Sequence, residues 1–111
     1  MKINQQDYND VTVVELHGEF IKEYDKLFTD TMSELVGKGR KGVVLEVSKM
    51  PFIDSVGLEK LLWLKDYCHE HHCHLKMTGL DDNFSKILEI TRLDSDFDKH
   101  AELSEAVKSF T

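Results

Sequence analysis

The sequence is poor in the residues that mark several classes of protein. It has one proline and two cysteines, Cys68 and Cys73, which are too few for the disulfide framework of a small secreted domain. Its apolar runs are short and interrupted by charges, so none is long enough to span a bilayer. No linker, internal repeat or low-complexity segment divides the 111 residues. We therefore predict one domain, residues 1–111, with a single core.

Basic residues are also scarce. The 14 lysines and arginines are outnumbered by 21 aspartates and glutamates, so the net charge is −7. No stripe of basic residues interleaved with aromatics is present, which argues against direct binding to nucleic acid. Any effect on transcription is therefore expected to act through another protein. Met1–Asp7 turns polar at once and lacks the apolar core of an export signal, which favours a cytoplasmic protein with free thiols.

The hydrophobic pattern predicts an α/β fold. Gly42–Val47 is a nearly continuous apolar run, typical of a central strand buried on both faces of a sheet. Downstream, apolar residues recur at spacings of three and four, which indicates a helix packed on that sheet. The residues of this stripe are Leu58, Leu61, Leu62, Leu64 and Cys68.

Other elements are predicted on both sides of this unit. The expected strands are Lys2–Tyr8, Val11–Glu19, His74–Thr78 and a weak strand within Phe97–Ala101. The expected helices are Tyr24–Val36, Phe84–Thr91 with Asp82 and Asn83 as cap candidates, and Leu103–Phe110. These elements form a mixed sheet of about four to five strands with helices mainly on one face.

The most informative segment, Met50–Leu58, joins the central strand to the following helix. Pro51 cannot donate into a central ladder, so the strand ends before it and a shaped loop follows. Asp54 and Ser55 then fall at the N-cap or in the first turn, where both side chains accept hydrogen bonds from free N–H groups. Gly57 allows another backbone or a ligand to approach closely.

Ser55 has two interpretations. A phosphate on its hydroxyl would be tolerated by the helix dipole and the unpaired amides of the first turn. That phosphate would add about −1.5 to −2 charge beside Asp54 and repel a partner docked over the helix start. In the alternative, Asp54 and Ser55 only cap the helix.

Several segments resemble the STAS domain of bacterial anti-sigma factor antagonists. They are Val13–Glu19, Val43–Ser48, Phe52–Leu58, and Leu88–Phe97 followed by Glu105–Val107. The resemblance covers nearly the whole chain, and its central segment is the specific one. It implies a STAS fold, and it places Ser55 at the position that a cognate anti-sigma factor kinase phosphorylates, with Asp54 as the acidic residue before it.

The chain departs from the family pattern at three positions. Ile21 lies in a segment where the family commonly has an aspartate near the phosphorylation site. Candidates for a replacement carboxylate are Glu19, Glu23 and Asp25. Val56 replaces a residue that is usually small, and its bulk would retune kinase or partner specificity. Arg92 stands where a glycine often precedes the Leu-Asp pair, and a cation there suits a helix C-terminus.

Thiols and imidazoles are concentrated between Cys68 and His74. On a helix, Cys68 and His72 would share one face, at positions i and i+4. However, a structural zinc site takes ligand pairs from separated segments, and histidines at a helix end also cap carbonyls. The sequence therefore favours a solvated helix end, and predicts no metal and no cofactor. A metal-binding sensor is the lesser alternative.

Two further features bear on function. Trp63 lies off the apolar stripe, on the side of Glu59, Lys60 and Tyr67, where it either anchors a partner or extends the core. Ser55, a histidine and Asp54 superficially supply a hydrolytic triad. Asp54 adjoins Ser55 and so cannot readily orient a remote base, and neither a nucleophile elbow nor an oxyanion loop surrounds Ser55. We therefore predict no catalytic residue and no enzymatic activity.

The resemblance implies a phosphorylation-controlled protein-binding module. Its unmodified form would bind an anti-sigma factor serine kinase and so release a sigma factor, phosphorylation of Ser55 would end binding, and a serine phosphatase would restore it. The expected partner-binding residues are Asp54, Ser55, Val56, Gly57, Glu59 and Trp63. A monomer or weak dimer is expected. The alternative is a structural or docking STAS subunit of a stress-sensing assembly or of a lipid or anion transport system.

Overall fold

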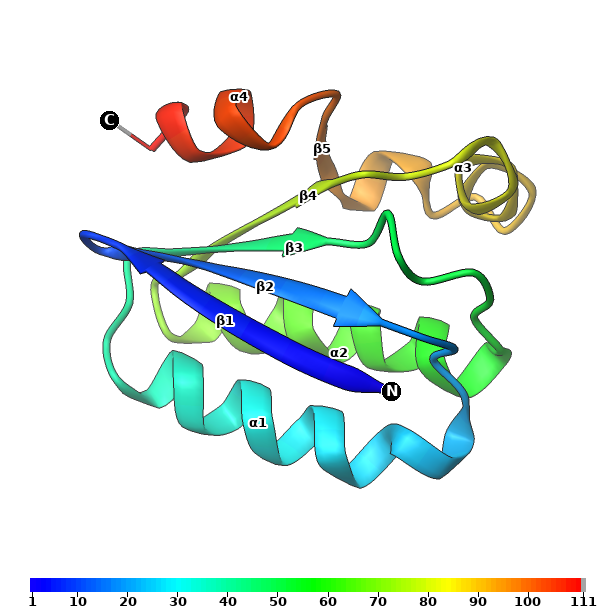
Figure 1. Cartoon of the computed structure of the whole chain (residues 1–111), viewed down its shortest axis with the longest axis horizontal. Coiled ribbons are helices and arrows are strands. Elements are labelled where there is room, and N and C mark those ends of the chain that lie inside the picture. Colours follow the sequence, from blue (N-terminus) through cyan, green and yellow to red (C-terminus); the bar gives the residue numbers. More distant parts are fainter. Residues whose placement is uncertain (111) are drawn as a thin grey trace.

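A five-stranded sheet forms the centre of the computed structural model, which describes residues 1–110 (Figure 1). The strands lie in the order in which they occur in the chain: β1 (Lys2–Tyr8), β2 (Val11–His17), β3 (Gly42–Glu46), β4 (His74–Thr78) and β5 (Asp98–His100). The short turn between β1 and β2 makes an antiparallel hairpin, and the strands from β2 to β5 are parallel. The mixed sheet and the α/β class agree with the prediction.

The helices cover both faces of the sheet unequally. Their bounds are α1 (Asp25–Gly37), α2 (Ser55–Glu70), α3 (Asp82–Ile90) and α4 (Leu103–Lys108), with single 3-10 turns at η1 (Lys22–Tyr24) and η2 (Asp94–Asp96). The long helices α1 and α2 pack against each other on one face, and the short α4 crosses the other. The helix α3 follows the C-terminal end of β4, close to the loop that leads into α2 (Figure 1).

The strand β3 is buried on both faces, as its sequence predicts. Val43 and Leu45 point into the main core, which α1 and α2 close. Val44 points to the opposite face and packs with Ala106 of α4 in a smaller cluster. Successive strand residues face opposite sides of a sheet, so this continuous apolar run supplies both cores at once.

The apolar stripe of α2 faces the main core. Leu61, Leu64 and Cys68 are fully buried there, and Leu58 and Leu62 are half-buried at its edge. Burying a leucine side chain contributes about 1.5 to 3 kcal/mol, so the stripe fixes the rotation of α2 about its axis. That rotation decides which residues of its first turn face outwards. Within residues 1–110, no helix has the length and apolar composition that crossing a membrane requires.

Several element ends differ from the prediction. The strand β2 stops at His17 because Gly18 has a φ of +96° and turns the chain out of the sheet. The N-cap of α3 is Asp81, whose side chain accepts from the Phe84 N–H at 2.8 Å, and not Asp82 or Asn83. The last helix ends at Lys108, two residues short of the expected Phe110.

Arg92 occupies a backbone conformation that favours glycine. Its φ is +62°, in the position just after the α3 C-cap Thr91. The Leu93 N–H donates to the Leu88 carbonyl at 2.8 Å, and the Arg92 N–H donates to the Glu89 carbonyl at 3.1 Å. This pair of bonds is the Schellman motif that ends many helices, usually with glycine at this position. The arginine therefore carries a conformational cost that a glycine would not.

Replacing Arg92 by glycine should stabilise the protein. Relief of the left-handed conformation is worth about 1 kcal/mol, and it should appear as a higher midpoint in urea denaturation. The Arg92→Ala variant is the matched control, because it removes the guanidinium but keeps the strain. If both variants unfold at the same urea concentration, the strain argument is wrong.

Candidate functional site

The loop between β3 and α2 is bound to the connection between β2 and α1. The Phe20 N–H donates to the Phe52 carbonyl at 2.9 Å, and the Asp54 N–H donates to the Phe20 carbonyl at 3.1 Å. Phe20 and Ile53 thereby form an isolated parallel bridge. Because these bonds hold the loop on both sides of Ile53, the start of α2 has a defined position.

Asp54 is the N-cap of α2. One carboxylate oxygen accepts from the Gly57 N–H at 2.8 Å, and the other accepts from the Lys22 N–H at 2.9 Å. The N–H of Gly57 lowers the pKa of this carboxyl most; burial opposes it, and the N–H groups of Lys22 and Val56 lower it further. Asp54 therefore stays ionised to a lower pH than an ordinary aspartate. Its carboxylate also occupies N–H groups of the first turn that would otherwise be free to bind an added anion.

Gly57 is buried against the same loop connection. A Cβ atom at this position would lie 2.6 Å from the Phe20 carbonyl oxygen and 2.8 Å from a side-chain carbon of Ile53. The close backbone approach expected here is therefore made by the chain itself. The absence of a side chain at Gly57 allows the first turn of α2 to pack against the Phe20 backbone, and this packing positions the site.

Ser55 is the first residue of α2, and its side chain is exposed. Glu59 follows at a spacing of four and is exposed, and Trp63 follows at the same spacing and is half-buried. Residues four apart lie on one face of a helix, so these three form one outward stripe. Val56 is half-buried beside Ser55. The sequence-predicted site residues thus lie at the N-cap and in the first three turns of α2, with Gly57 buried and the others exposed or half-buried.

Trp63 extends the edge of the main core, which is one of the two roles expected for it. It packs on the edge of the main core, and its ring stacks on that of Tyr67 with a centroid separation of 5.0 Å. Tyr67 in turn contacts the ring of His71 at 4.2 Å, and Lys60 lies over Trp63 at 5.6 Å. The tryptophan is therefore an ordered part of the α2 surface.

Two of the candidate replacement carboxylates have partners of their own. Asp25 forms an ion pair with Lys60, with 3.0 Å between its oxygen and the ammonium nitrogen. Glu23 accepts from the Tyr24 hydroxyl, and this hydrogen bond is the main cause of the raised pKa of Tyr24. The charge of Glu19 also raises that pKa, by a smaller amount. The acids of the β2–α1 connection are thus engaged around Lys60 and Tyr24.

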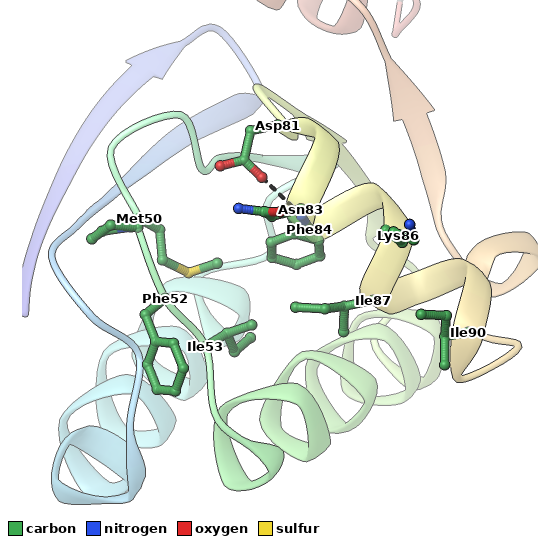
Figure 2. Close-up of a pocket in the computed structure, with 10 residues that line it drawn as sticks. Met50, Phe52, Ile53, Asp81, Asn83, Phe84, Lys86, Ile87 and Ile90 are labelled. Carbon is green, nitrogen blue, oxygen red and sulfur yellow. Dashed lines mark hydrogen bonds between the residues drawn. The ribbon is translucent and has the colours of Figure 1, made fainter.

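An apolar groove lies beside this site, and sequence analysis did not find it. Figure 2 shows Met50, Phe52 and Ile53 of the β3–α2 loop facing residues of α3 across it. Its volume is about 300 Å³. Phe52 is 53% exposed and Ile90 is 71% exposed, so large apolar side chains remain open to solvent on both walls. The one sequence signal is that Ile90 falls off the buried stripe of its helix.

The dense cluster of thiols and imidazoles does not form the expected helical face. The helix α2 ends at Glu70, and His72 has a φ of +56°, so Cys68 and His72 are not successive turns of one helix. His71 instead contacts the Tyr67 carbonyl through Nδ1 at 2.8 Å. Within residues 1–110, no group of three or more His, Cys, Asp or Glu side chains is arranged to hold a metal ion.

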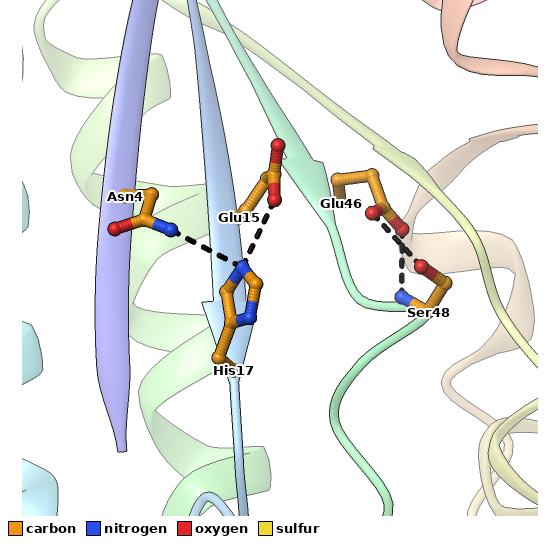
Figure 3. Close-up of polar contacts among 5 residues, drawn as sticks. All are labelled: Asn4, Glu15, His17, Glu46 and Ser48. Atoms are coloured by element: carbon orange, nitrogen blue, oxygen red, sulfur yellow. Dashed lines mark hydrogen bonds and ion pairs between the residues drawn. The ribbon is translucent and has the colours of Figure 1, made fainter.

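Four of the six histidines lie too far from Ser55 to serve it as a base. Those between His69 and His74 lie at the opposite end of α2, about 20 Å from Ser55 for a helix of this length. His17 is engaged at the end of β2, where its Nε2 lies 2.9 Å from Glu15 and 3.3 Å from Asn4 (Figure 3). Beside it, Glu46 accepts from the backbone and the hydroxyl of Ser48.

Comparison with known proteins places the fold in a family. The family model of the STAS domain matches residues 2–109, so the chain belongs to the STAS domain family. Among curated protein sequences, none matches significantly. The predicted family and fold are therefore confirmed.

Solved structures of the same fold come from several kinds of protein. An anti-sigma factor antagonist from Mycobacterium paratuberculosis has a TM-score of 0.87 at 19% identity, over 98% of this chain and 92% of that one. The phosphorylated Bacillus cell fate determinant SpoIIAA has a TM-score of 0.77 at 14% identity, over 99% and 100%. A sulfate transporter family protein from Wolinella succinogenes has a TM-score of 0.75 at 18% identity, over 93% and 86%. At such identities the likeness establishes the fold alone.

Substitution of Gly57 by alanine should destabilise the protein. The new methyl group would overlap the Phe20 carbonyl, and overpacking of this kind costs about 1 to 3 kcal/mol. Gly37→Ala is the control, because a Cβ atom there meets no other atom within 4 Å. Chemical denaturation should show a loss for Gly57→Ala and none for Gly37→Ala; equal midpoints would refute the packing role.

The stabilising effect of Asp54 should depend on pH. The pKa of this carboxyl is lower in the folded protein, so its contribution is fully present above the ordinary value of 3.8 and disappears as pH falls through the folded value. The Asp54→Ala variant should therefore have a lower urea midpoint than wild type at neutral pH, and the gap should narrow in acid. The exposed Asp66→Ala serves as control. A gap that stays constant from neutral to acid pH would contradict this role.

Proposed function

We propose that this protein is an anti-sigma factor antagonist controlled by phosphorylation of Ser55. In its unmodified form it binds an anti-sigma factor that is also a serine kinase, and a sigma factor is thereby released. The kinase phosphorylates Ser55, the complex separates, and a serine phosphatase restores the binding form. The protein supplies the acceptor serine and the binding surface, and no catalytic group.

One observation carries the proposal: Ser55 is exposed and directly follows Asp54, the N-cap whose carboxylate accepts from the Gly57 and Lys22 N–H groups. A phosphate there would bring about −1.5 to −2 charge next to a carboxylate that already occupies the amides of Gly57 and Lys22. The new charge would find little compensation within the protein and would project into any docked surface. Modification would therefore weaken binding and leave the fold intact.

The surroundings of Ser55 suit a protein partner. The stripe of Ser55, Glu59 and Trp63 supplies hydroxyl, carboxylate and aromatic groups from one face of α2, and the groove beside it offers exposed apolar area. Asp54, Val56 and Gly57 shape this surface at the helix start. The net charge of −7 favours a basic partner surface.

Solved anti-sigma factor antagonists with the same fold support the proposal. SpoIIAA, described as an anti-sigma factor antagonist, has been solved in both phosphorylated and unphosphorylated forms, and both have the fold of this chain. An anti-sigma factor antagonist from another organism has the same fold over 98% of this chain. We propose that the protein acts in the bacterial cytoplasm, where a sigma factor and its regulators act.

A docking subunit of a larger assembly is the second candidate. It is favoured by the similarity to a sulfate transporter family protein. In this case the α2 surface would bind its neighbours permanently, and a negative charge at Ser55 would not control assembly.

Substitutions at Ser55 should separate these functions. We expect Ser55→Ala to retain a kinase-like anti-sigma factor from native lysate as well as wild type does, and Ser55→Asp to lose about tenfold or more, because a charge beside Asp54 opposes docking. Mass spectrometry of the captured proteins and of the Ser55 peptide is the measurement. Phosphate on Ser55 of the wild-type protein should accompany partner release.

Ser104→Asp is the matched control, because it puts the same charge on an exposed serine in the first turn of α4. This variant should bind like wild type. If all Ser55 variants retain the same partners equally, the switch fails; transport components among those partners would favour the docking subunit. Size-exclusion chromatography adds a check, since the antagonist is expected to be a monomer or weak dimer before it meets its kinase.

A further inference from the structure

Cys68 and Cys73 occupy paired positions at the end of α2. The Cys73 N–H donates to the Cys68 carbonyl at 2.8 Å, and the His72 N–H donates to the His69 carbonyl at 3.2 Å. With the positive φ of His72, these bonds form a Schellman motif. Cys68 and Cys73 occupy the two positions of this motif whose side chains are commonly in contact.

The backbone brings the two cysteines within reach of a covalent bond. With 2.8 Å between the carbonyl oxygen and the amide nitrogen, standard bond lengths place the two Cα atoms at most about 6.7 Å apart. Disulfides span Cα separations of about 4.4 to 6.8 Å. Both side chains are buried in the same core cluster, and the two thiols share a hydrogen bond. Both cysteines are free in this structure.

The two sulfur atoms differ in access and in acidity. Cys68 is fully buried, whereas Cys73 is 5% exposed and lines a surface groove with His69 and His74. The hydrogen bond from Cys68 lowers the pKa of the Cys73 thiol, burial opposes this, and the nearby Arg40 guanidinium lowers it further. Hydrogen bonding and burial raise the pKa of Cys68. Cys73 is thus the sulfur that meets an oxidant first.

We propose that Cys68 and Cys73 form a reversible disulfide within one chain when the protein meets a hydroperoxide. The Cys73 thiolate attacks the outer peroxide oxygen, the O–O bond breaks, and the leaving alkoxide takes the proton that Cys73 gave up. Cys73 is then a sulfenic acid. The Cys68 sulfur attacks the Cys73 sulfur, the S–S bond forms, and the hydroxyl group leaves as water with the Cys68 proton.

The disulfide would bind the last turn of α2 to the residue before β4. It adds a modification site at the opposite end of α2 from Ser55, in a protein whose proposed switch is phosphorylation. Because the chemistry needs only this chain and a hydroperoxide, it stands or falls independently of any kinase or partner.

Peroxide treatment of the folded, reduced wild-type chain tests the proposal. Hydrogen peroxide should remove two hydrogen atoms from the intact mass, and subsequent alkylation under denaturing conditions should modify neither cysteine. Cleavage after Lys65 and Lys76 should release one peptide that contains both cysteines joined to each other. Dithiothreitol should restore two alkylatable thiols. Two thiols that stay free, or oxidation that ends in linked dimers, would overturn the proposal.

Single variants test the order of the steps. In Cys68→Ala, Cys73 should stop at the sulfenic acid and be trapped by dimedone. In Cys73→Ala, Cys68 should stay reduced at a peroxide dose that oxidises wild type completely. Far-UV circular dichroism checks that each variant is folded. If one is not, the intact mass and the peptide of the oxidised wild-type protein still show whether the Cys68–Cys73 disulfide forms. Faster oxidation of Cys68 than of Cys73 would overturn the assignment of the reacting sulfur.

Discussion

The backbone of Phe20 is the constraint on which the site depends. Its N–H and carbonyl groups bind the β3–α2 loop on both sides of Ile53, and its carbonyl fills the space that only a glycine at position 57 leaves open. The loop therefore has one path, although the regular pairing of β3 already ends at Glu46. The start of α2 and the orientation of its first turn follow from this path.

Asp54 both stabilises the start of α2 and fixes a negative charge there. Its carboxylate satisfies backbone amides of two segments, those of Gly57 in α2 and of Lys22 before α1. In satisfying them it also fixes a negative charge next to the one exposed hydroxyl of the helix start. A helix N-terminus normally attracts an anion, but here the attraction is already taken up by the protein's own side chain.

The sequence predicted local features better than tertiary ones. Apolar periodicity predicted the strands and helices. The position of Asp54 and Ser55 at a helix start was predicted because both residue types are common there. The groove between Phe52 and Ile90 escaped prediction because its walls come from segments that meet only in the folded chain. The prediction that Cys68 and His72 share a helical face was wrong because His72 adopts a left-handed conformation. Few residues other than glycine adopt it, and apolar periodicity does not reveal it. The cap at Asp81 was missed by one residue, a usual error at helix ends.

The spatial order of the strands has a consequence for how the protein is made. Each strand pairs with the one synthesised just before it, so the sheet can grow from the hairpin of β1 and β2 outwards as the chain leaves the ribosome. At every stage one parallel edge stays open for the next strand. The last addition, Asp98–His100, is short and charged, and such an edge discourages pairing with a neighbouring molecule. The same three residues that complete the sheet therefore also protect this edge from pairing with another molecule.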